Sequence, residues 1–413
     1  MNKHFLFMGM AAAMLFASCS NDDELAGTGS NKQPLASDEP IALSLSQKGI
    51  VTRAPLGNLD EDGNYDQTFD AKGLGIFCLA NDKIFGKEDI NWTKGYANPN
   101  YLWFENRKAD AVSKFDAELN KKVTDLEWEA PTDENEYSYF YPMGSQYSYK
   151  FFGYYPYKEA VNHTGETFTV DFDNLDGTID VIWGESKVKE DDAQAKYAWS
   201  AKYFREKSTE VGPSYNKKEF YPNIEFRHKF MKFNIIIKKG NDEDGELSKI
   251  GVKHVSLQNV CTKGTLTVAT REKGKTSGTF APDWTTTATL DLKDVKDADL
   301  DPSKTFFGDE LQRTIGQGFM LPVLAKLEDG TYVDNGFVSG GMRGKGVFRL
   351  QVEYNKNVSP EKVYKSAQYE VAPPEGGWKE GYEYDIVISV SSPLKIEATA
   401  SLVGWEKGTI ELQ

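Results

Sequence analysis

The sequence predicts an all-β protein with two tandem Greek-key β-sandwich domains behind an N-terminal leader. Aromatic residues and glycine are abundant, with 24 Phe, 21 Tyr, 8 Trp and 36 Gly. About a dozen or more short segments alternate apolar and polar residues between turn signals, which is typical of strands. The chain has 413 residues, and removing the first 53 leaves 360, which is too many for one core and suits two domains.

Residues 1–18 are predicted to be a secretion signal. Lys3 and His4 give a short positive start, an apolar run follows from Phe5 to Phe16, and small residues precede Cys19. A run of about a dozen apolar residues is too short to span a bilayer, which needs roughly 20 residues.

Cys19 is the predicted lipidation site, because small residues that end at a cysteine mark cleavage before an acylated thiol, such as a palmitoylated one. Lipid at Cys19 would anchor the protein to a membrane without spanning it. Phe16 stands where lipoprotein signals usually carry leucine, so ordinary cleavage with an incidental Cys19 is the alternative.

Residues 19–53 are predicted to form a lipidated linker followed by a strand. The linker over 20–39 is rich in Ser, Asn, Asp and Gly. The segment from Ile41 to Val51 alternates, with Ile41, Leu43 and Leu45 on one face, and it stops at Thr52-Arg53-Ala54.

Residues 54–219 are predicted to form the N-terminal sandwich. A strand is expected over 73–80 and another over 179–183, and one helix is expected over 107–122 from the spacing of Ala111, Val112, Phe115 and Leu119. The dense aromatics of 137–157 are interpreted as core, with a sugar-binding platform as the alternative. Residues 184–219 read as a polar loop and give the domain boundary.

Residues 220–413 are predicted to form the C-terminal sandwich. Met231, Phe233, Ile235 and Ile237 should share one buried face, and Asp329-Gly330 signals a two-residue hairpin. The remaining strands are expected at 252–260, 264–270, 285–292, 348–354, 384–390 and 396–402.

Composition argues against nucleic acid as a partner, because the net charge is −15 and the charges are spread along the chain. Cys78 and Cys261 would be the two remaining cysteines after lipidation of Cys19. One disulfide between them is the alternative, and two buried free thiols are the favoured interpretation.

No residues are predicted to be catalytic, to bind a cofactor or to bind a metal. The four histidines are isolated and lack metal-ligand spacing, and His228 at a strand start is interpreted as structural. Alternating Asp and Asn residues over 60–66 resemble calcium ligands, but the glycine at 63 is misplaced for a calcium loop and a solvated turn is favoured. The glycine-rich stretch 340–346 lacks the following helix of a phosphate site. We therefore expect a protein that is not an enzyme.

Several sequence pieces taken in order resemble the fimbrillin-like surface lipoproteins of Bacteroidales, which are the subunits of type V pili. The acidic run of residues 20–24 also resembles the export signal of surface lipoproteins in these bacteria. The pieces are the Cys19 start, VTRA at 51–54, GLGIF at 73–77, FFGYYPY at 151–157, FRHKFMKF at 226–233, WKEGYEY at 378–384 and VGWE at 403–406.

This resemblance implies two tandem transthyretin-like β-sandwich domains and no cofactor. It also implies a precursor on the cell outer membrane that passes into a fimbrium after processing. An arginine-specific protease would remove the lipidated N-terminus together with the first strand. The groove left behind would be filled by C-terminal strands of another fimbrial subunit through strand addition.

On this chain the resemblance makes Ile41–Val51 the removable strand and the bond between Arg53 and Ala54 the processing site, although the next residue, Pro55, restricts the backbone there. The candidates for the donor strand are Ile396, Ala398, Ala400 and Leu402. The alternative is that these residues form the last core strand of the second domain.

The implied function is a structural or tip subunit of a fimbria in cell adhesion. Stalk, tip and assembly-anchor roles stay open, and a receptor on a host or bacterial surface is a further candidate partner. Two other functions are kept as alternatives: a surface-anchored glycan-binding lipoprotein that stacks sugars on exposed aromatics, and a β-sandwich glycan hydrolase with paired carboxylates.

Overall fold

The structure is a computed structural model of the 413-residue chain. The predicted signal residues 1–18, Cys19, Arg53, Ala54, residues 60–66 and residues 340–346 lie outside the described residues. Among the described residues no helix is long and apolar enough to cross a membrane. The described residues are 36–47, 69–81, 90–94, 101–130, 139–142, 148–187, 199–240, 251–283, 285–291, 312–321, 325–326, 332–333, 348–355, 364–371, 378–392 and 395–402.

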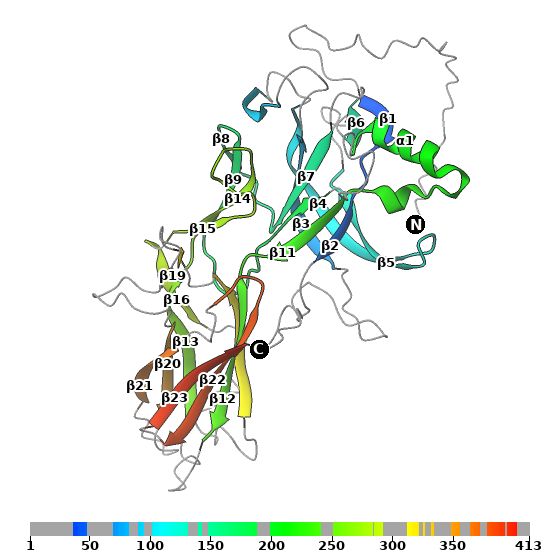
Figure 1. Ribbon diagram of the computed structural model, residues 1–413. Coiled ribbons are helices and arrows are strands. Elements are labelled where there is room, and N and C mark those ends of the chain that lie inside the picture. Colours follow the sequence, from blue (N-terminus) through cyan, green and yellow to red (C-terminus); the bar gives the residue numbers. More distant parts are fainter. Residues whose placement is uncertain are drawn as a thin grey trace, which may run out of the picture.

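Seven strands close into a barrel in the upper part of Figure 1, in the order β10-β11-β2-β5-β4-β3-β7. The prediction of a mostly β protein is confirmed, and the closure of this barrel is a feature that the sequence did not predict. The barrel strands are β2 (Ser44–Gln47), β3 (Ala71–Ala80), β4 (Leu102–Asp116), β5 (Lys121–Trp128), β7 (Tyr149–Tyr155), β10 (Ile182–Ser186) and β11 (Asn223–His228).

Aromatic side chains of the barrel strands are buried, as the sequence predicts for the region around β7. Phe151 and Tyr154 of β7 are fully buried, and so is Phe77 of β3. Phe77 packs against Phe168 with ring centroids 5.7 Å apart. Large rings of this kind supply much of the apolar area that stabilises a β core. The interpretation of these aromatics as core is confirmed for Tyr141, Tyr149, Phe151, Phe152 and Tyr154, whereas Tyr139, Phe140, Tyr155 and Tyr157 are only partly buried.

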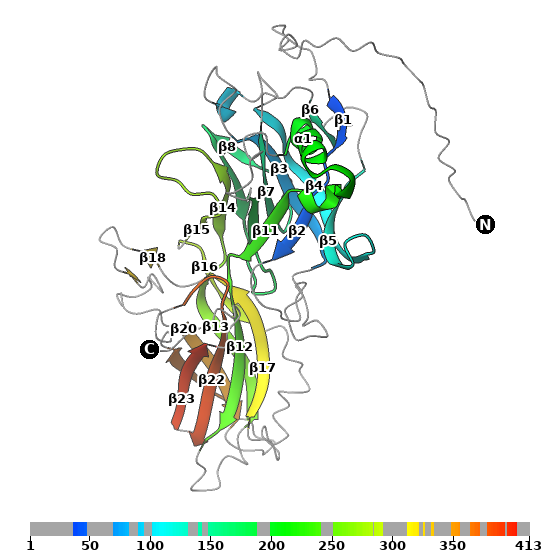
Figure 2. The same ribbon diagram turned by 45° about the vertical axis from the view of Figure 1, so that its right-hand side comes forward.

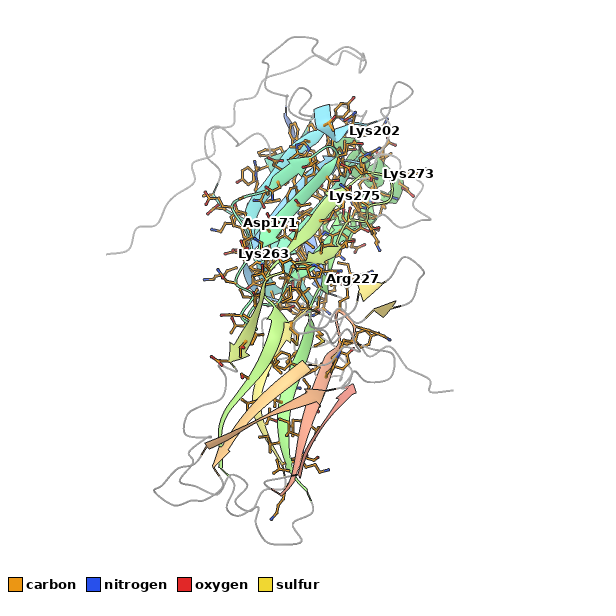
Figure 3. All side chains as sticks on the ribbon, turned by 90° about the vertical axis from the view of Figure 1, so that its left-hand side faces the viewer. Asp171, Lys202, Arg227, Lys263, Lys273 and Lys275 are labelled. Carbon is orange, nitrogen blue, oxygen red and sulfur yellow. The ribbon has the colours of Figure 1, made fainter. Side chains whose placement is uncertain are left out.

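Two smaller sheets flank the barrel. β1 (Ala36–Pro40) pairs with β6 (Phe140–Pro142). A four-stranded sheet has the order β15-β14-β9-β8, with bounds Asn162–Thr164 for β8, Thr167–Phe172 for β9, Gly264–Thr270 for β14 and Phe280–Pro282 for β15. Figure 3 labels two residues of this region. Asp171 lies on β9, and Lys263 lies just before β14.

The helix predicted over 107–122 is wrong, because these residues form strand β4, a turn and the start of β5. Ala109 and Ala111 are buried two residues apart, as in a strand, whereas Phe115 is 63% exposed. The Asp116 carboxylate accepts hydrogen bonds from the backbone N–H groups of Glu118 and Leu119 at 2.9 and 3.1 Å, which stabilises the turn. Tertiary pairing of β4 with β3 thus overrides the helical spacing of a few apolar residues.

The loop predicted over 184–219 is also partly wrong, because it contains helix α1 (Ala201–Val211). Ser200 is its N-cap and accepts a hydrogen bond from the Tyr203 N–H at 3.2 Å. Tyr203 and Phe204 bury the inner face of α1. The described residues include the short 3-10 helices η1 (Trp92–Lys94), η4 (Gly212–Ser214) and η5 (Lys217–Phe220).

The lower part of Figure 1 contains two four-stranded sheets that face each other, β17-β12-β22-β23 and β16-β13-β20-β21. The predicted buried face of β12 is confirmed, since Met231, Phe233, Ile235 and Ile237 are fully buried. The strands are β12 (Met231–Lys239), β13 (Gly251–Cys261), β16 (Thr287–Asp291), β17 (Gln312–Met320), β20 (Phe348–Asn355), β21 (Tyr364–Val371), β22 (Glu383–Ser392) and β23 (Lys395–Leu402).

The predicted Asp329-Gly330 hairpin is represented by β18 (Ala325–Lys326) and β19 (Tyr332–Val333), which pair antiparallel. The two turn residues themselves lie outside the described residues.

The chain passes from the barrel to the lower sheets through two residues, Lys229 and Phe230, between β11 and β12. Strand β14 returns to pair with β9. Segments from both sides of position 219 therefore share sheets, and the division of the chain into domains at that position stays a prediction.

Candidate functional site

Strand β2 occupies one place in the wall of the barrel, which we call the β2 slot. It lies between β11, to which it runs parallel, and β5, to which it runs antiparallel (Figure 2). Ser44 pairs with Asn223 on one side and with Asp125 on the other. Among the described strands of the barrel, β2 alone precedes residue 53 in the chain. Without it, β11 and β5 would each lose a neighbour and the barrel would be open.

Three aliphatic side chains hold this segment in the core. Ile41, Leu43 and Leu45 are 3%, 2% and 4% exposed, and they belong to the cluster that contains Ile224 and Phe226 of β11. The prediction that these three side chains share a buried face is therefore confirmed. Burying each stabilises the fold by about 1.5–3 kcal/mol. Their removal would expose a continuous apolar trough.

Both backbone polar groups of Ile41 form hydrogen bonds with residues distant in the chain. Its N–H donates to the Tyr139 carbonyl at 2.8 Å, and its carbonyl accepts from the Trp128 indole Nε1 at 3.1 Å. Ile41 lies between β1 and β2, outside either ladder. A side chain thus supplies the hydrogen bond that a ladder would otherwise give.

The Trp128 ring is fixed by an aromatic cluster. It makes edge contacts with Phe104 and Tyr139 at centroid distances of 5.5 and 5.8 Å. The Arg107 guanidinium lies over the rings of Phe104 and Tyr139, at 4.7 and 4.3 Å from their centroids. This packing orients the indole N–H before any strand binds it.

The outer side of the slot is polar. Ser44 Oγ donates to Asn223 Oδ1 at 3.3 Å, and Asn223 Nδ2 donates to Ser46 Oγ at 2.7 Å. Glu39, at the end of β1, forms an ion pair with Lys217 of η5. Burial raises the pKa of Tyr215 to about 12, and the negative charge of Glu39 adds to that rise.

The structure places some of the predicted site residues and not others. Cys19, Arg53 and Ala54 lie outside the described residues. Strand β23 is at the edge of its sheet, antiparallel to β22, and it carries the four donor candidates. These candidates are Ile396, Ala398, Ala400 and Leu402.

Sequence reasoning missed the residues that line the slot, namely Trp128, Tyr139, Lys217 and Asn223. They come from segments that are far apart in the chain, from Trp128 to Asn223, and no local motif links them. The local signals were the strand pattern around Trp128 and the aromatic run that contains Tyr139, and these predict a strand and core positions, not a binding role.

The other candidate groups are structural. His228 Nδ1 lies 2.6 Å from Asp180 Oδ2, and both side chains are buried where β11 ends. Cys78 and Cys261 are buried free thiols, as favoured from the sequence, and burial raises the pKa of each. Within the described ranges no three His, Cys, Asp or Glu side chains come together in a way that could hold a metal ion.

Comparison with known proteins gives a family. The fimbrillin-like family model matches residues 66–314, which is more than half of the chain. No curated protein matches the chain.

Solved structures cover most of the chain at low identity. A candidate cell-adhesion protein from Bacteroides uniformis is 17% identical, with 90% of this chain and 100% of that chain covered and a TM-score of 0.45. A fimbrial protein from Bacteroides vulgatus is 14% identical, with coverages of 89% and 100% and a TM-score of 0.43. The tip fimbrial protein Mfa3 from Porphyromonas gingivalis, truncated at its C-terminus, is 11% identical, with coverages of 88% and 99% and a TM-score of 0.35. On the family match, this chain belongs to the fimbrillin-like family, whose members are fimbrial cell-adhesion proteins and not enzymes.

Proposed function

We propose that this protein is a subunit of a surface fimbria that assembles by protease-triggered strand exchange. The precursor is held at the outer membrane by lipid on Cys19, and an arginine-specific protease cuts between Arg53 and Ala54. Loss of the segment before Ala54 removes β2 and opens the slot. A C-terminal strand of a neighbouring subunit then enters it.

One observation carries the proposal. Closure of the barrel depends on β2, a strand that lies upstream of Arg53. A cut after Arg53 therefore leaves β2 with no covalent link to the other strands of the barrel. The vacated slot would present unpaired edges of β5 and β11 beside an apolar trough, which is the arrangement that binds an added strand.

The donor in this proposal is the segment of β23, with Ile396, Ala398, Ala400 and Leu402 entering the trough. β23 has a strand neighbour on one side only in the described sheet, so its release breaks one ladder. The proposal also treats residues 54–219 and 220–413 as tandem transthyretin-like domains, one with the acceptor slot and the other with the donor strand.

The test is direct. Folded precursor that lacks residues 1–19 is treated with an arginine-specific protease and inspected for polymers by electron microscopy. Polymers should form after clean loss of residues 20–53, and Arg53→Ala protein should stay monomeric under the same treatment. Polymerisation of the Arg53→Ala protein to the level of the parent would count against Arg53 as the trigger. Complete cleavage without polymer at high concentration would count against a stalk role.

The glycan-binding alternative has less support. Most of the large aromatic side chains whose exposure is described are buried, and Phe115 is the exposed one. A row of exposed rings, which sugar stacking needs, is not among the residues that the structure describes.

A further inference from the structure

The side chain of Asn223 bridges two hydroxyl groups of the strand in the slot. Its carbonyl oxygen accepts from Ser44 Oγ and its amide nitrogen donates to Ser46 Oγ. An asparagine amide has one accepting end and one donating end, and a hydroxyl can take either role, so both ends are satisfied together. Asn223 itself is exposed, and it stands directly opposite Ser44 in the ladder.

We infer that Asn223 selects the strand that enters the slot, and that the favoured occupant is β23 of a second copy with Thr399 and Ser401 on the Asn223 amide. The inference rests on the proposed function. It adds the register of the incoming strand in the slot and the residue, Asn223, that recognises that strand.

The register follows from the aromatic end of the slot. Tyr139 and Trp128 bind the N–H and the carbonyl of a single residue, which is Ile41 in the intact chain. The hydroxyl groups that Asn223 binds come three and five residues later, and the buried leucines come two and four residues later. An occupant therefore needs an aliphatic residue at the position that Ile41 takes between Tyr139 and Trp128. Counted from that residue, it also needs aliphatic residues at +2 and +4 and hydroxyl residues at +3 and +5.

The β23 segment has this spacing. With Ile396 in the place of Ile41, Thr399 and Ser401 take the places of Ser44 and Ser46. Ala398 and Ala400 take the places of Leu43 and Leu45. The strand direction is also preserved, so the new strand runs parallel to β11 as β2 does.

The two alanines have a consequence for timing. They fill the leucine positions incompletely, and replacing a buried leucine by alanine is costly. β23 of a second copy is therefore a weaker occupant than β2, and it enters only after β2 has been cut away. Leu394 stands two residues before Ile396, at the position that Glu39 has before Ile41. Binding of β23 is therefore weakened further, because Lys217 would lose its ion pair with Glu39.

The test uses folded precursor cleaved after Arg53 and two labelled synthetic peptides, residues 36–47 and residues 393–404. Fluorescence anisotropy gives the Kd of each peptide. We expect both to bind, the second more weakly. Replacing the two hydroxyl residues in either peptide, Ser44→Ala with Ser46→Ala or Thr399→Val with Ser401→Ala, should weaken binding about three- to tenfold.

A double-mutant cycle assigns this loss to Asn223. In Asn223→Ala protein the hydroxyl-free peptides should bind as well as the unmodified ones. Arg227→Ala is the matched control, because Arg227 lies on the same strand and bonds with Glu225 instead of β2; it should retain the full hydroxyl effect (Figure 3).

The outcomes distinguish selection by Asn223 from strand exchange itself. Equal binding of hydroxyl-free and unmodified peptides to unmodified protein overturns selection by Asn223 and leaves strand exchange standing. Binding of the 36–47 peptide without binding of the 393–404 peptide overturns β23 as the occupant. Failure of the 36–47 peptide to bind the cleaved protein overturns the proposed function itself, and the inference with it.

Discussion

The indole Nε1 of Trp128 donates a hydrogen bond to the backbone carbonyl of Ile41 at 3.1 Å, so a residue of β5 holds the segment that leads into β2. The bond replaces one that a continuous ladder would have made, because Ile41 lies between two short strands. The same indole N–H would be left free when the segment before Ala54 is removed, and it is then positioned for the backbone of another strand.

Trp128→Phe should weaken the hold on the first strands without opening the aromatic cluster. The phenyl ring keeps much of the contact with Phe104 and Tyr139 but has no donor for Ile41. We expect a loss of about 0.5–1.5 kcal/mol in the free energy of unfolding, measured by urea denaturation. After cleavage at Arg53, the N-terminal fragment should also dissociate faster.

Trp183→Phe is the control for that experiment, since its Nε1 bonds with the Val268 carbonyl away from the slot. It should lower stability without changing the rate at which the fragment dissociates. An unchanged rate in Trp128→Phe would show that the indole bond does not hold the strand.

Leu43→Ala should be strongly destabilising, because Leu43 is 2% exposed in the apolar trough. The lost contacts and the resulting cavity predict about 2–5 kcal/mol, measured by chemical denaturation of the uncleaved protein. Phe115→Ala removes a larger side chain that is 63% exposed, and it should change stability by no more than about 0.5 kcal/mol. A comparable loss in both variants would contradict the burial of Leu43 as the reason.

The strands that the sequence predicts well are those with a two-residue period and a single buried face. β12 and β22 are examples, with Phe233 and Ile386 fully buried in alternating patterns. The wrong helix at 107–122 arises because Ala111, Phe115 and Leu119 also fit a helical period, and only the pairing of β4 with β3 and β5 decides between the two. Local patterns cannot contain that information.

Helix α1 was missed for a different reason. Its signal is the Ser200 cap followed by Tyr203 and Phe204, which is short and is surrounded by polar residues. The β2 slot lies beyond local prediction altogether, because Asn223 and Ser46 are 177 residues apart and meet only through the parallel pairing of β2 with β11.

Alkaline pH should destabilise the protein through Tyr384. Burial raises the pKa of Tyr384 to about 12, against about 10 in an unfolded chain. The folded state therefore keeps its proton where the unfolded state loses it, so the stabilising contribution is complete below pH about 10 and is lost as pH rises towards about 12. Tyr384→Phe removes this ionisation, and its stability should fall less than that of the parent across that range. Parallel curves for the two proteins, measured by urea denaturation at each pH, would contradict it.

The ion pair of Lys232 and Glu383 joins β12 to β22 at 3.0 Å, with both side chains largely buried. Glu383→Leu alone leaves the ammonium group of Lys232 buried without its carboxylate, and it should cost about 3–5 kcal/mol in the free energy of unfolding. Lys232→Met combined with Glu383→Leu should recover most of that loss, because the double variant buries no unpaired charge. Lys263→Met is the matched control: Lys263 pairs with Asp173 at 3.1 Å on the surface, so its loss should cost at most about 1 kcal/mol. A double variant as unstable as Glu383→Leu would mean that the pair contributes packing or hydrogen bonds, such as that from Asn234 to Glu383, and not charge compensation.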